Sequence, residues 1–205
     1  MRIGVLALQG AFARHARVFA ELGAATVLVR VPADLVGVDA LAMPGGESTT
    51  MSKLLVTSGL FPELHAAIRA GLPVLGTCAG MILLAHEVLD GRADQVSFDA
   101  IDITVRRNGY GRQVDSFEAD LTIPGLDETF GTPGGTPAGA VAGGAFRAVF
   151  IRAPVVTDVG AGAQVLARYQ HMPVLVRQGV ITVASFHPEL SNDHRLHAQF
   201  LQEVG

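Results

Sequence analysis

Cysteine is almost absent from this chain of 205 residues, in which Cys78 is the only one. A single thiol cannot form an internal disulfide, and it cannot build a thiolate zinc cluster. Charged residues are also scarce, at 17%, whereas apolar residues make up 49%. That balance excludes a disordered chain and favours a compact one with much buried sheet. The length fits a single domain, 1–205, whose core needs no disulfide or metal to stabilise it.

Long apolar runs and basic runs are missing as well. No stretch is both uncharged and apolar over the roughly 18 residues that a membrane span requires. The apolar part of residues 1–8 is too short for a secretory signal. The net charge is −4 and basic residues do not cluster, which argues against a nucleic-acid partner. We therefore expect a cytoplasmic protein that binds neither nucleic acid nor membrane.

Short apolar runs alternate with helical patterns in the first half of the chain. Apolar spacing of three and four predicts helices, and short Val- and Leu-rich runs predict buried strands. The predicted strands are 2–8, 25–31, 38–43 and 73–75, and the predicted helices are 11–22, 48–58, 61–70 and one that follows Cys78. This alternation predicts an α/β fold with a mostly parallel central sheet and helices on both faces.

The second half changes character. Apolar and polar residues alternate, which predicts additional strands that we expect to be antiparallel. They cover residues 98–106, 114–123, 148–151, 164–169, 174–177 and 180–186. A last helix near 193–203 could be capped by Asn192 or Asp193. The Gly-rich tract 131–145 reads as a surface loop.

Cys78 lies in the segment GTCAG, between a predicted strand and a predicted helix. Small residues on both sides allow a sharp turn that lifts a nucleophile clear of the backbone. The free N–H groups and the positive dipole end of the following helix favour a thiolate over a thiol. The alternative is that Cys78 is a small buried filler, which is the usual fate of a free cysteine.

A cysteine nucleophile needs a base, and the base needs a group that orients it. The segment SFHPE, just after the last predicted strand, offers His187 and Glu189. If the extended backbone persists through Pro188, both side chains project to the same side, and Glu189 could hold the imidazole of His187. Strand ends of a parallel sheet meet at one edge, which would bring His187 to Cys78. The alternative is an ordinary His-Pro turn with a solvated glutamate.

The segment PGGES at 44–48 also follows a strand and opens a helix. Adjacent glycines let backbone N–H groups approach a substrate closely, as in a cradle for an oxyanion or a carboxylate. The alternative is a plain turn in which Ser48 caps the helix. Neither G-x-G-x-x-G nor G-K-[ST] occurs, which excludes the common dinucleotide and phosphate motifs.

The remaining histidines carry weaker signals. His15, His65 and His86 fall on predicted helices, where we expect packed or surface residues. His194 and His197 are three apart on the last helix and could pair on a metal, but no further ligand accompanies them. We therefore expect neither a metal nor a cofactor.

Taken together, the motifs resemble the class I (triad) glutamine amidotransferase family, and most closely the glutaminase subunits of pyridoxal 5'-phosphate synthase. The motifs that carry the resemblance are GVLALQG at 4–10, PGGEST at 44–49, GTCAG at 76–80, RN at 107–108, GRQVDSF at 111–117, FIRAP at 150–154 and SFHPEL at 185–190. They span nearly the whole chain. The tract 131–145 is longer than is usual in this family, but it lies outside every motif.

The resemblance implies a flavodoxin-like fold and a role for each matched residue. Cys78 would be the nucleophile, His187 the base and then the acid, and Glu189 the orienting carboxylate. The residues that would hold glutamine are Gly46, Glu47, Ser48, Arg107, Ile151 and Arg152. The oxyanion hole would involve Gly46, Ala79 and the Gln9-Gly10 peptide, which reorients when the synthase partner docks.

The implied reaction is hydrolysis of L-glutamine to L-glutamate and ammonia, and the implied partner is a synthase subunit that consumes the ammonia. Three alternatives remain open from the residues alone. The same half-reaction could serve another synthase, such as one that makes imidazole glycerol phosphate. The chain could be a non-catalytic binding module on the same fold, or a cysteine hydrolase or protease with a similar turn.

Overall fold

The computed structural model describes residues 1–107, 109, 116–126 and 144–205. Asn108, most of the 111–117 motif and most of the Gly-rich tract 131–145 lie outside these residues. Among the residues that are described, no helix is long and apolar enough to cross a membrane.

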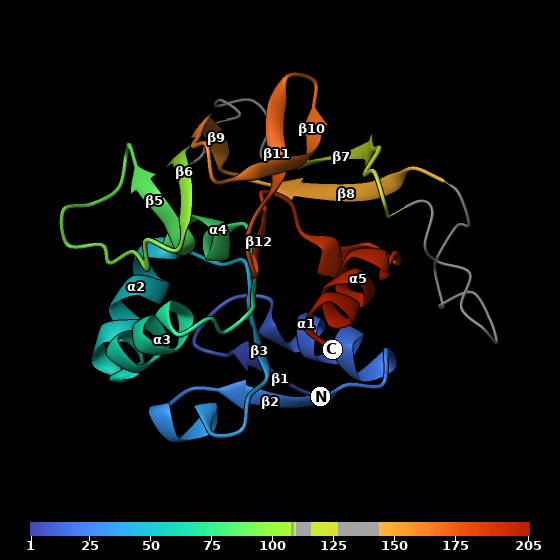
Figure 1. Cartoon of the computed structure of the whole chain (residues 1–205). Coiled ribbons are helices and arrows are strands. Elements are labelled where there is room, and N and C mark those ends of the chain that lie inside the picture. The colour runs from blue at the N-terminus through green and yellow to red at the C-terminus, as the bar shows by residue number, and fades with distance from the viewer. Residues whose placement is uncertain (108, 110–115, 127–143) are drawn as a thin grey trace.

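A central sheet of seven strands runs through the described part of the molecule, in the order β10-β11-β12-β4-β3-β1-β2 (Figure 1). The strands are β1 (Arg2–Leu6), β2 (Ala25–Val29), β3 (Ala40–Met43), β4 (Val74–Thr77), β10 (Gln164–Tyr169), β11 (Met172–Gln178) and β12 (Ile181–Ala184). The stretch from β2 to β12 is parallel, and β11 and β10 continue it antiparallel. The prediction of a mostly parallel sheet with antiparallel strands late in the chain is confirmed.

The direction of β12 differs from our expectation of an antiparallel strand. A hairpin with Gly179 at φ 55° joins β11 to β12, so these two strands are antiparallel. On its other side β12 pairs parallel with β4, and Ala184 lies opposite Thr77. The carboxyl ends of β4 and β12 therefore emerge side by side at one edge of the sheet.

Helices cover both faces of the sheet (Figure 1). Helices α1 (Phe12–Glu21) and α5 (Arg195–Val204) lie on one face, and α2 (Ser48–Thr57), α3 (Leu60–Arg69) and α4 (Ala79–Leu84) lie on the other. On α1 the spacing of His15, Val18 and Phe19 turns all three toward the sheet, where they are buried. Phe19 packs with the inward residues of β1 and β3 and with Phe200 of α5 in one apolar cluster.

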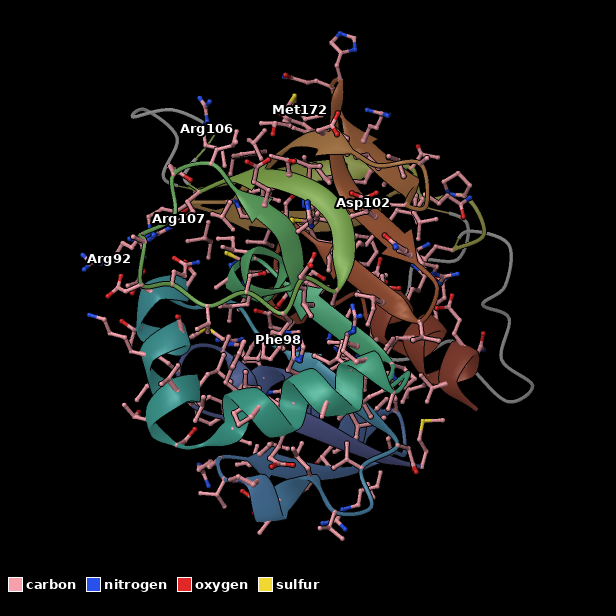
Figure 2. The ribbon with its side chains drawn as sticks, turned by 60° about the vertical axis from the view of Figure 1, so that its left-hand side comes forward. Arg92, Phe98, Asp102, Arg106, Arg107 and Met172 are labelled. Carbon is pink, nitrogen blue, oxygen red and sulfur yellow. The ribbon has the colours of Figure 1, made fainter. Side chains whose placement is uncertain are left out.

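Two smaller sheets extend this frame beyond the strand ends. One contains β5 (Ala85–Val88), β6 (Ile101–Arg106) and β9 (Val155–Val159), and the other contains β7 (Ser116–Leu121) and β8 (Phe146–Ile151). Phe98 lies between the first small sheet and α3, where it stacks on Phe61 (Figure 2). The sequence patterns did not predict β5 or β9, and His86, expected on a helix, lies on β5.

The last helix begins slightly later than predicted. Its first residue is Arg195, and His194 occupies the cap position without a side-chain hydrogen bond to the helix. Asp193 nevertheless accepts a hydrogen bond from the backbone N–H of Arg195 at 3.1 Å, and its carboxylate pairs with the buried guanidinium of Arg195 at 2.6 Å. Asp193 therefore supports this end of the helix from one residue before the cap. The short 3₁₀ turns are η1 (Pro32–Leu35) and η2 (Pro188–Leu190).

Candidate active site

Cys78 occupies the turn between β4 and α4, as the sequence predicted. Its backbone has φ 49° and ψ −104°, a conformation that few residues with side chains adopt. The backbone N–H of Cys78 donates to the carbonyl of Ala184 on β12 at 2.8 Å, which ties the turn to the neighbouring strand. A Cβ at Gly80 would lie 2.1 Å from the carbonyl oxygen of Met43, so α4 can approach β3 this closely only with glycine there.

His187 follows β12 at the same edge of the sheet. Its backbone N–H donates to the carbonyl of Val149 on β8 at 2.8 Å, which fixes the segment after the strand. Its imidazole lies beside Cys78, since a Cβ at Gly45 would be 2.3 Å from Cε1 of the ring and 3.1 Å from Cβ of Cys78, and the cysteine is one of the main influences that raise the pKa of His187. The adjacent, parallel ends of β4 and β12 thus bring together two residues that are far apart in the sequence.

Glu189 contacts the other side of the same imidazole. The Nδ1 of His187 lies 2.7 Å from Oε1 of Glu189, and the carboxylate is fully buried. Our reason for expecting this contact was wrong, because the backbone is not extended after His187. Pro188 opens the 3₁₀ turn η2, and this turn carries Glu189 back beneath the ring.

Both ionisable partners of this pair are strongly shifted. Burial alone would lower the pKa of His187, but hydrogen bonds with Cys78 and Glu189 raise it to about 10. Burial alone would raise the pKa of Glu189, but the imidazoles of His15 and His187 hold it well below its usual range. At neutral pH the pair is therefore an imidazolium and a carboxylate.

The glycine segment after β3 lies directly against this group. A Cβ at Gly45 would be 2.3 Å from Cε1 of His187 and 3.1 Å from Cβ of Cys78. The carbonyl of Gly45 accepts from the N–H of Ala11 at 3.2 Å, and Gly10, at φ 93°, leaves no room for a side chain beside that carbonyl. The segment is therefore sandwiched between the catalytic candidates and the loop after β1.

The side chain of Gln9 holds the next peptide of the same segment. Its Oε1 accepts a hydrogen bond from the backbone N–H of Glu47 at 2.7 Å. A Cβ at Gly46 would lie 2.3 Å from that oxygen, so a side chain there would displace the amide of Gln9. Gln9, Gly10 and Gly46, all expected near an oxyanion hole, are thus in mutual contact.

Glu47 caps α2, a role that we had considered for Ser48. Its carboxylate accepts from the N–H groups of Thr49 and Thr50 at 3.0 and 2.7 Å. Partial burial would raise the pKa of Glu47, but the hydrogen bonds from Thr50 and Thr49 lower it to about 2. Ser48 is buried behind it. A fixed negative charge therefore stands at the rim of the site.

Arg107 provides a positive charge beside that carboxylate. It comes just after β6 and lies above α2 (Figure 2). Its Nη2 is 3.1 Å from Oε1 of Glu47, and its Nη1 donates to Oε1 of Gln95 at 3.3 Å. The pair is half-buried, so both charges can also face a ligand that carries an ammonium and a carboxylate.

Ile151 and Arg152 close the opposite side. The carbonyl oxygen of Ile151 lies 3.9 Å from Sγ of Cys78. Arg152 has a positive φ of 43°, which turns the chain sharply after β8. This turn brings the Ile151 backbone to the nucleophile candidate.

These segments surround a cavity of about 320 Å³. Most of the residues that the sequence singled out line it: Gln9, Gly10, Gly46, Glu47, Ser48, Cys78, Arg107, Ile151, Arg152 and His187. Ala79 and Glu189 do not; Glu189 lies behind His187. Ala11, Gly45, Ile82 and Leu190 also line the cavity; none of them was named as a site residue, although Gly45 and Leu190 lie within the matched motifs. For Gly45 the adjacent glycine pair was the available signal.

The other histidines separate into surface and buried positions. His86 is exposed and lies 2.7 Å from Asp99. His15 and His197 are fully buried and contact each other, and His15 also contacts Glu189. Within the described residues, no group of three or more His, Cys, Asp or Glu side chains could hold a metal ion.

Known proteins resemble this chain over nearly its whole length. The model of the SNO glutamine amidotransferase family matches residues 5–205. The chain is 50% identical over 203 residues to the pyridoxal 5'-phosphate synthase subunit PdxT of Frankia casuarinae, covering 99% of this chain and 94% of that protein. It is also 50% identical to the protein of the same name from Mycobacteroides abscessus, covering 98% and 96%.

Solved structures show the same similarity. A crystal structure described as a glutamine amidotransferase is 44% identical, with a TM-score of 0.86, and covers 99% of this chain and 98% of that one. A second glutamine amidotransferase structure, from Thermotoga maritima, is only 13% identical, with a TM-score of 0.60. It covers 100% of this chain and 84% of that one, and the two share the fold.

Proposed function

Because the chain belongs to the SNO glutamine amidotransferase family, we propose that it is the glutaminase subunit of a pyridoxal 5'-phosphate synthase. It hydrolyses L-glutamine to L-glutamate and ammonia. The observation that carries this proposal is that Cys78 and His187 line one cavity, while Glu189 lies behind His187 with its carboxylate 2.7 Å from Nδ1 of the ring. Residues 1–205 act as one glutamine amidotransferase domain.

In the first half of the reaction, Cys78 attacks the side-chain amide carbon of glutamine. His187 acts as the base that takes the proton of the sulfur and carries it as the imidazolium. As the tetrahedral intermediate collapses, His187 donates its proton to the amide nitrogen, which leaves as ammonia. A glutamyl thioester on Cys78 remains, and His187 is neutral.

In the second half, the neutral imidazole accepts a proton from water, and the resulting hydroxide attacks the thioester. Glutamate leaves, and the thiolate–imidazolium pair is restored. Glu189 keeps Nδ1 of the ring protonated, so that Nε2 faces the sulfur and the substrate in both halves. General acid–base catalysis of this kind contributes about 10²–10⁴-fold to the rate.

The oxyanion of each tetrahedral intermediate is stabilised by backbone N–H groups of Gly46 and Ala79. Removing one such donor typically costs about 10²–10³-fold in rate. Without the partner, Gln9 binds the peptide that follows Gly46, and Gly10 lies against Gly45. We propose that the Gln9-Gly10 peptide reorients when the synthase partner docks, and that this completes the oxyanion hole.

Glutamine is recognised by the charges at the rim. The carboxylate of Glu47 faces the substrate ammonium, and the guanidinium of Arg107 binds the substrate carboxylate. These two side chains already pair with each other at 3.1 Å, so their charges are positioned before glutamine arrives. Gly46, Ser48, Ile151 and Arg152 complete the glutamine site.

The product explains the need for a partner. Free ammonia is mostly protonated at neutral pH and is then no longer a nucleophile, so it should pass directly to the enzyme that uses it. The relatives are named as subunits of pyridoxal 5'-phosphate synthase, which supports that the partner is the synthase subunit. We place the complex in the cytoplasm, where a lone reduced cysteine is stable.

The test measures glutamate release from glutamine with and without a pyridoxal 5'-phosphate synthase subunit. We expect release that the partner stimulates and that disappears in Cys78→Ala. The matched control is Arg92→Ala, because Arg92 is exposed and does not line the cavity. No release with any partner from the folded protein would instead support the binding module, and release only with another synthase would contradict the assignment to vitamin B6 synthesis.

A further inference from the structure

Glu189 has two carboxylate oxygens, and each faces a different imidazole. Oε1 lies 2.7 Å from Nδ1 of His187, as the proposed mechanism requires. Oε2 lies 3.2 Å from Nε2 of His15, and both of these side chains are fully buried. The mechanism above gives His15 no role, although it contacts the carboxylate that orients the catalytic imidazole.

His15 connects this carboxylate to the strand that carries the nucleophile. It projects from α1, and its Nε2 also lies 3.2 Å from Oγ1 of Thr77, the last residue of β4 and the neighbour of Cys78. The Nε2–H bond of His15 points at the oxygen of Thr77. Oε2 of Glu189 lies at a similar distance from Nε2 but away from the direction of this bond, so it accepts no hydrogen bond from it. One imidazole thus fixes the carboxylate relative to the end of β4.

His197 determines which nitrogen of His15 carries the proton. Its Nε2 lies 3.0 Å from Nδ1 of His15, whereas its own Nδ1 is buried without a partner among the described residues. A buried N–H without an acceptor costs more than a bare lone pair, so the proton of His197 belongs on Nε2. It then donates to Nδ1 of His15, which leaves the N–H of His15 on Nε2, directed at Thr77, with Oε2 of Glu189 3.2 Å from the same nitrogen.

The state of His197 agrees with this order of hydrogen bonds. Burial lowers the pKa of His197 well below its usual value, so that the ring is neutral and carries one N–H. His197 on α5 therefore donates to His15 on α1, and His15 lies against one oxygen of Glu189. His187 contacts the other oxygen of the same carboxylate. A buried carboxylate with only one of these two imidazoles would be free to rotate or to take up a proton.

From this geometry we infer that His15 is a positioning residue for catalysis: bound to Thr77, its ring is fixed against the second oxygen of Glu189 at 3.2 Å, so that the carboxylate stays aligned with Nδ1 of His187. His197 supports it by fixing its tautomer. The inference rests on the proposed function, since it concerns the same imidazole. The competing interpretation is that His15 only packs α1 against the sheet.

The test compares three variants of α1, each assayed as the full chain together with the synthase partner. His15→Leu keeps the volume and removes the N–H, whereas His15→Gln offers an amide N–H in a similar place. Val18→Ala is the matched control, because Val18 is buried on the same face of α1, one turn further along. For each variant, kcat, KM for glutamine and the pH profile of kcat are measured.

For His15→Leu we expect kcat to fall by roughly tenfold or more, with KM changed by less than about twofold, as for loss of an outer hydrogen-bond partner of a functional histidine. The titratable groups around Glu189 are His15 from α1 and His187 after β12, and behind them His197 from α5 and Cys78 after β4. Without the N–H of His15 the carboxylate protonates more easily, so the acidic limb of the profile moves to higher pH. In His15→Gln we expect kcat to be partly restored. In Val18→Ala we expect a loss of folding stability without a change in kcat.

A second readout does not depend on turnover. The proton on Nδ1 of His187 gives a downfield NMR signal as long as Glu189 accepts from it, and we expect this signal to weaken or shift in His15→Leu and, less strongly, in His197→Leu. If the signal weakened or shifted in His15→Leu while the wild-type protein released no glutamate with any partner, the proposed function would fail, but His15 would still be shown to align Glu189 with His187.

Three results would overturn the inference. The first is a folded, partner-bound His15→Leu with unchanged kcat and pH profile. The second is a loss of kcat in His15→Leu, His15→Gln and Val18→Ala that simply follows their stability. The third result applies if His15→Leu does not fold. It is an NMR signal of the His187 Nδ1 proton that is unchanged in both His15→Gln and His197→Leu.

Discussion

At the scale of single residues, the proposed nucleophile has a strained backbone. Cys78 has φ 49° and ψ −104°, and conformations of this kind cost about 1–3 kcal/mol unless glycine adopts them. The surroundings impose it, because the N–H of Cys78 is bonded to Ala184 and α4 packs tightly on β3 at Gly80. The strained conformation therefore fixes the position of the sulfur and lowers the stability of the fold.

The strain predicts an unusual order of stabilities at this position. At an ordinary site, alanine is more stable than glycine by about 0.4–1 kcal/mol. Here we expect Cys78→Gly to be at least as stable as Cys78→Ala, by up to about 2 kcal/mol, because glycine relieves the backbone. Urea unfolding of the two inactive variants measures the difference. A glycine variant that is the less stable of the two by the ordinary margin would show that the turn is not strained.

The shifted pKa values of His187 and Glu189 predict how stability depends on pH. The pKa of His187 is raised to about 10, so its contribution is complete below its unfolded value near 6.5 and is lost as the pH rises through about 10. The pKa of Glu189 is lowered, so its contribution is present above about 4.5 and is lost as the pH falls. The pair stabilises the fold most between these unfolded values.

We expect the gap in unfolding free energy between the wild type and His187→Gln to shrink with rising pH. Between about pH 6 and pH 9 the change should be on the order of 1 kcal/mol or more. Denaturant titrations at several pH values measure it, with His171→Gln, an exposed histidine, as the control. A gap that stays constant over this range would mean that His187 is not held as an imidazolium in the folded protein.

The individual roles of residues were only partly predictable. Cys78, His187 and Glu189 carry local signals, since each lies next to a strand end with small residues or proline beside it. His15 does not, because a histidine on the apolar face of a helix looks like any packed residue. Its contacts with Thr77, Glu189 and His197 join four segments that only the tertiary fold brings together.

At the scale of elements, the close approach of the β3–α2 loop to the ends of β4 and β12 shapes the site. Gly45 lies so near His187 that a Cβ would be 2.3 Å from Cε1 and 3.0 Å from Nδ1. Real Cβ atoms do not approach other atoms this closely, so either the loop or the ring must move. The glycine is therefore required by the imidazole of His187, not by a turn, since its φ is not positive.

The crowding at Gly45 predicts a selective loss of activity. We expect Gly45→Ala to lower kcat by about 10²-fold or more, because a shift of about 1 Å in a catalytic group has that effect. Gly162→Ala is the control, since its nearest neighbour would lie at an ordinary 3.5 Å. Partner-stimulated glutamate release and thermal unfolding are measured for both. Equal activity in the two variants would mean that the loop yields without disturbing His187.

Periodicity predicted the existence of most elements but not the local path between them. The helix after Cys78 was expected, yet β5 begins immediately at its end, where Ala85 continued the apolar run. The contact between His187 and Glu189 was expected from an extended backbone, and a 3₁₀ turn at Pro188 makes it instead. Proline restricts its own φ in either conformation, so the sequence could not distinguish them.

At the scale of the whole molecule, the strand order creates the site. Strand β12 inserts beside β4 and parallel to it, although its sequence neighbour β11 is antiparallel to it. Alternating apolar residues predict a strand but not the direction of its partner, so the meeting of His187 and Cys78 was expected from the general layout of parallel sheets and not from the sequence of β12. Without it, Cys78 and His187 would emerge at opposite edges of the sheet.

The most direct test of the account is detection of the covalent intermediate. The protein, together with its synthase partner, is mixed with glutamine, quenched in acid during turnover, digested and analysed by mass spectrometry. We predict a glutamyl thioester on the peptide that contains Cys78, and none in Cys78→Ser or when glutamate replaces glutamine. Turnover without an adduct, in a protein whose Cys78→Ser variant still releases glutamate, would contradict the account.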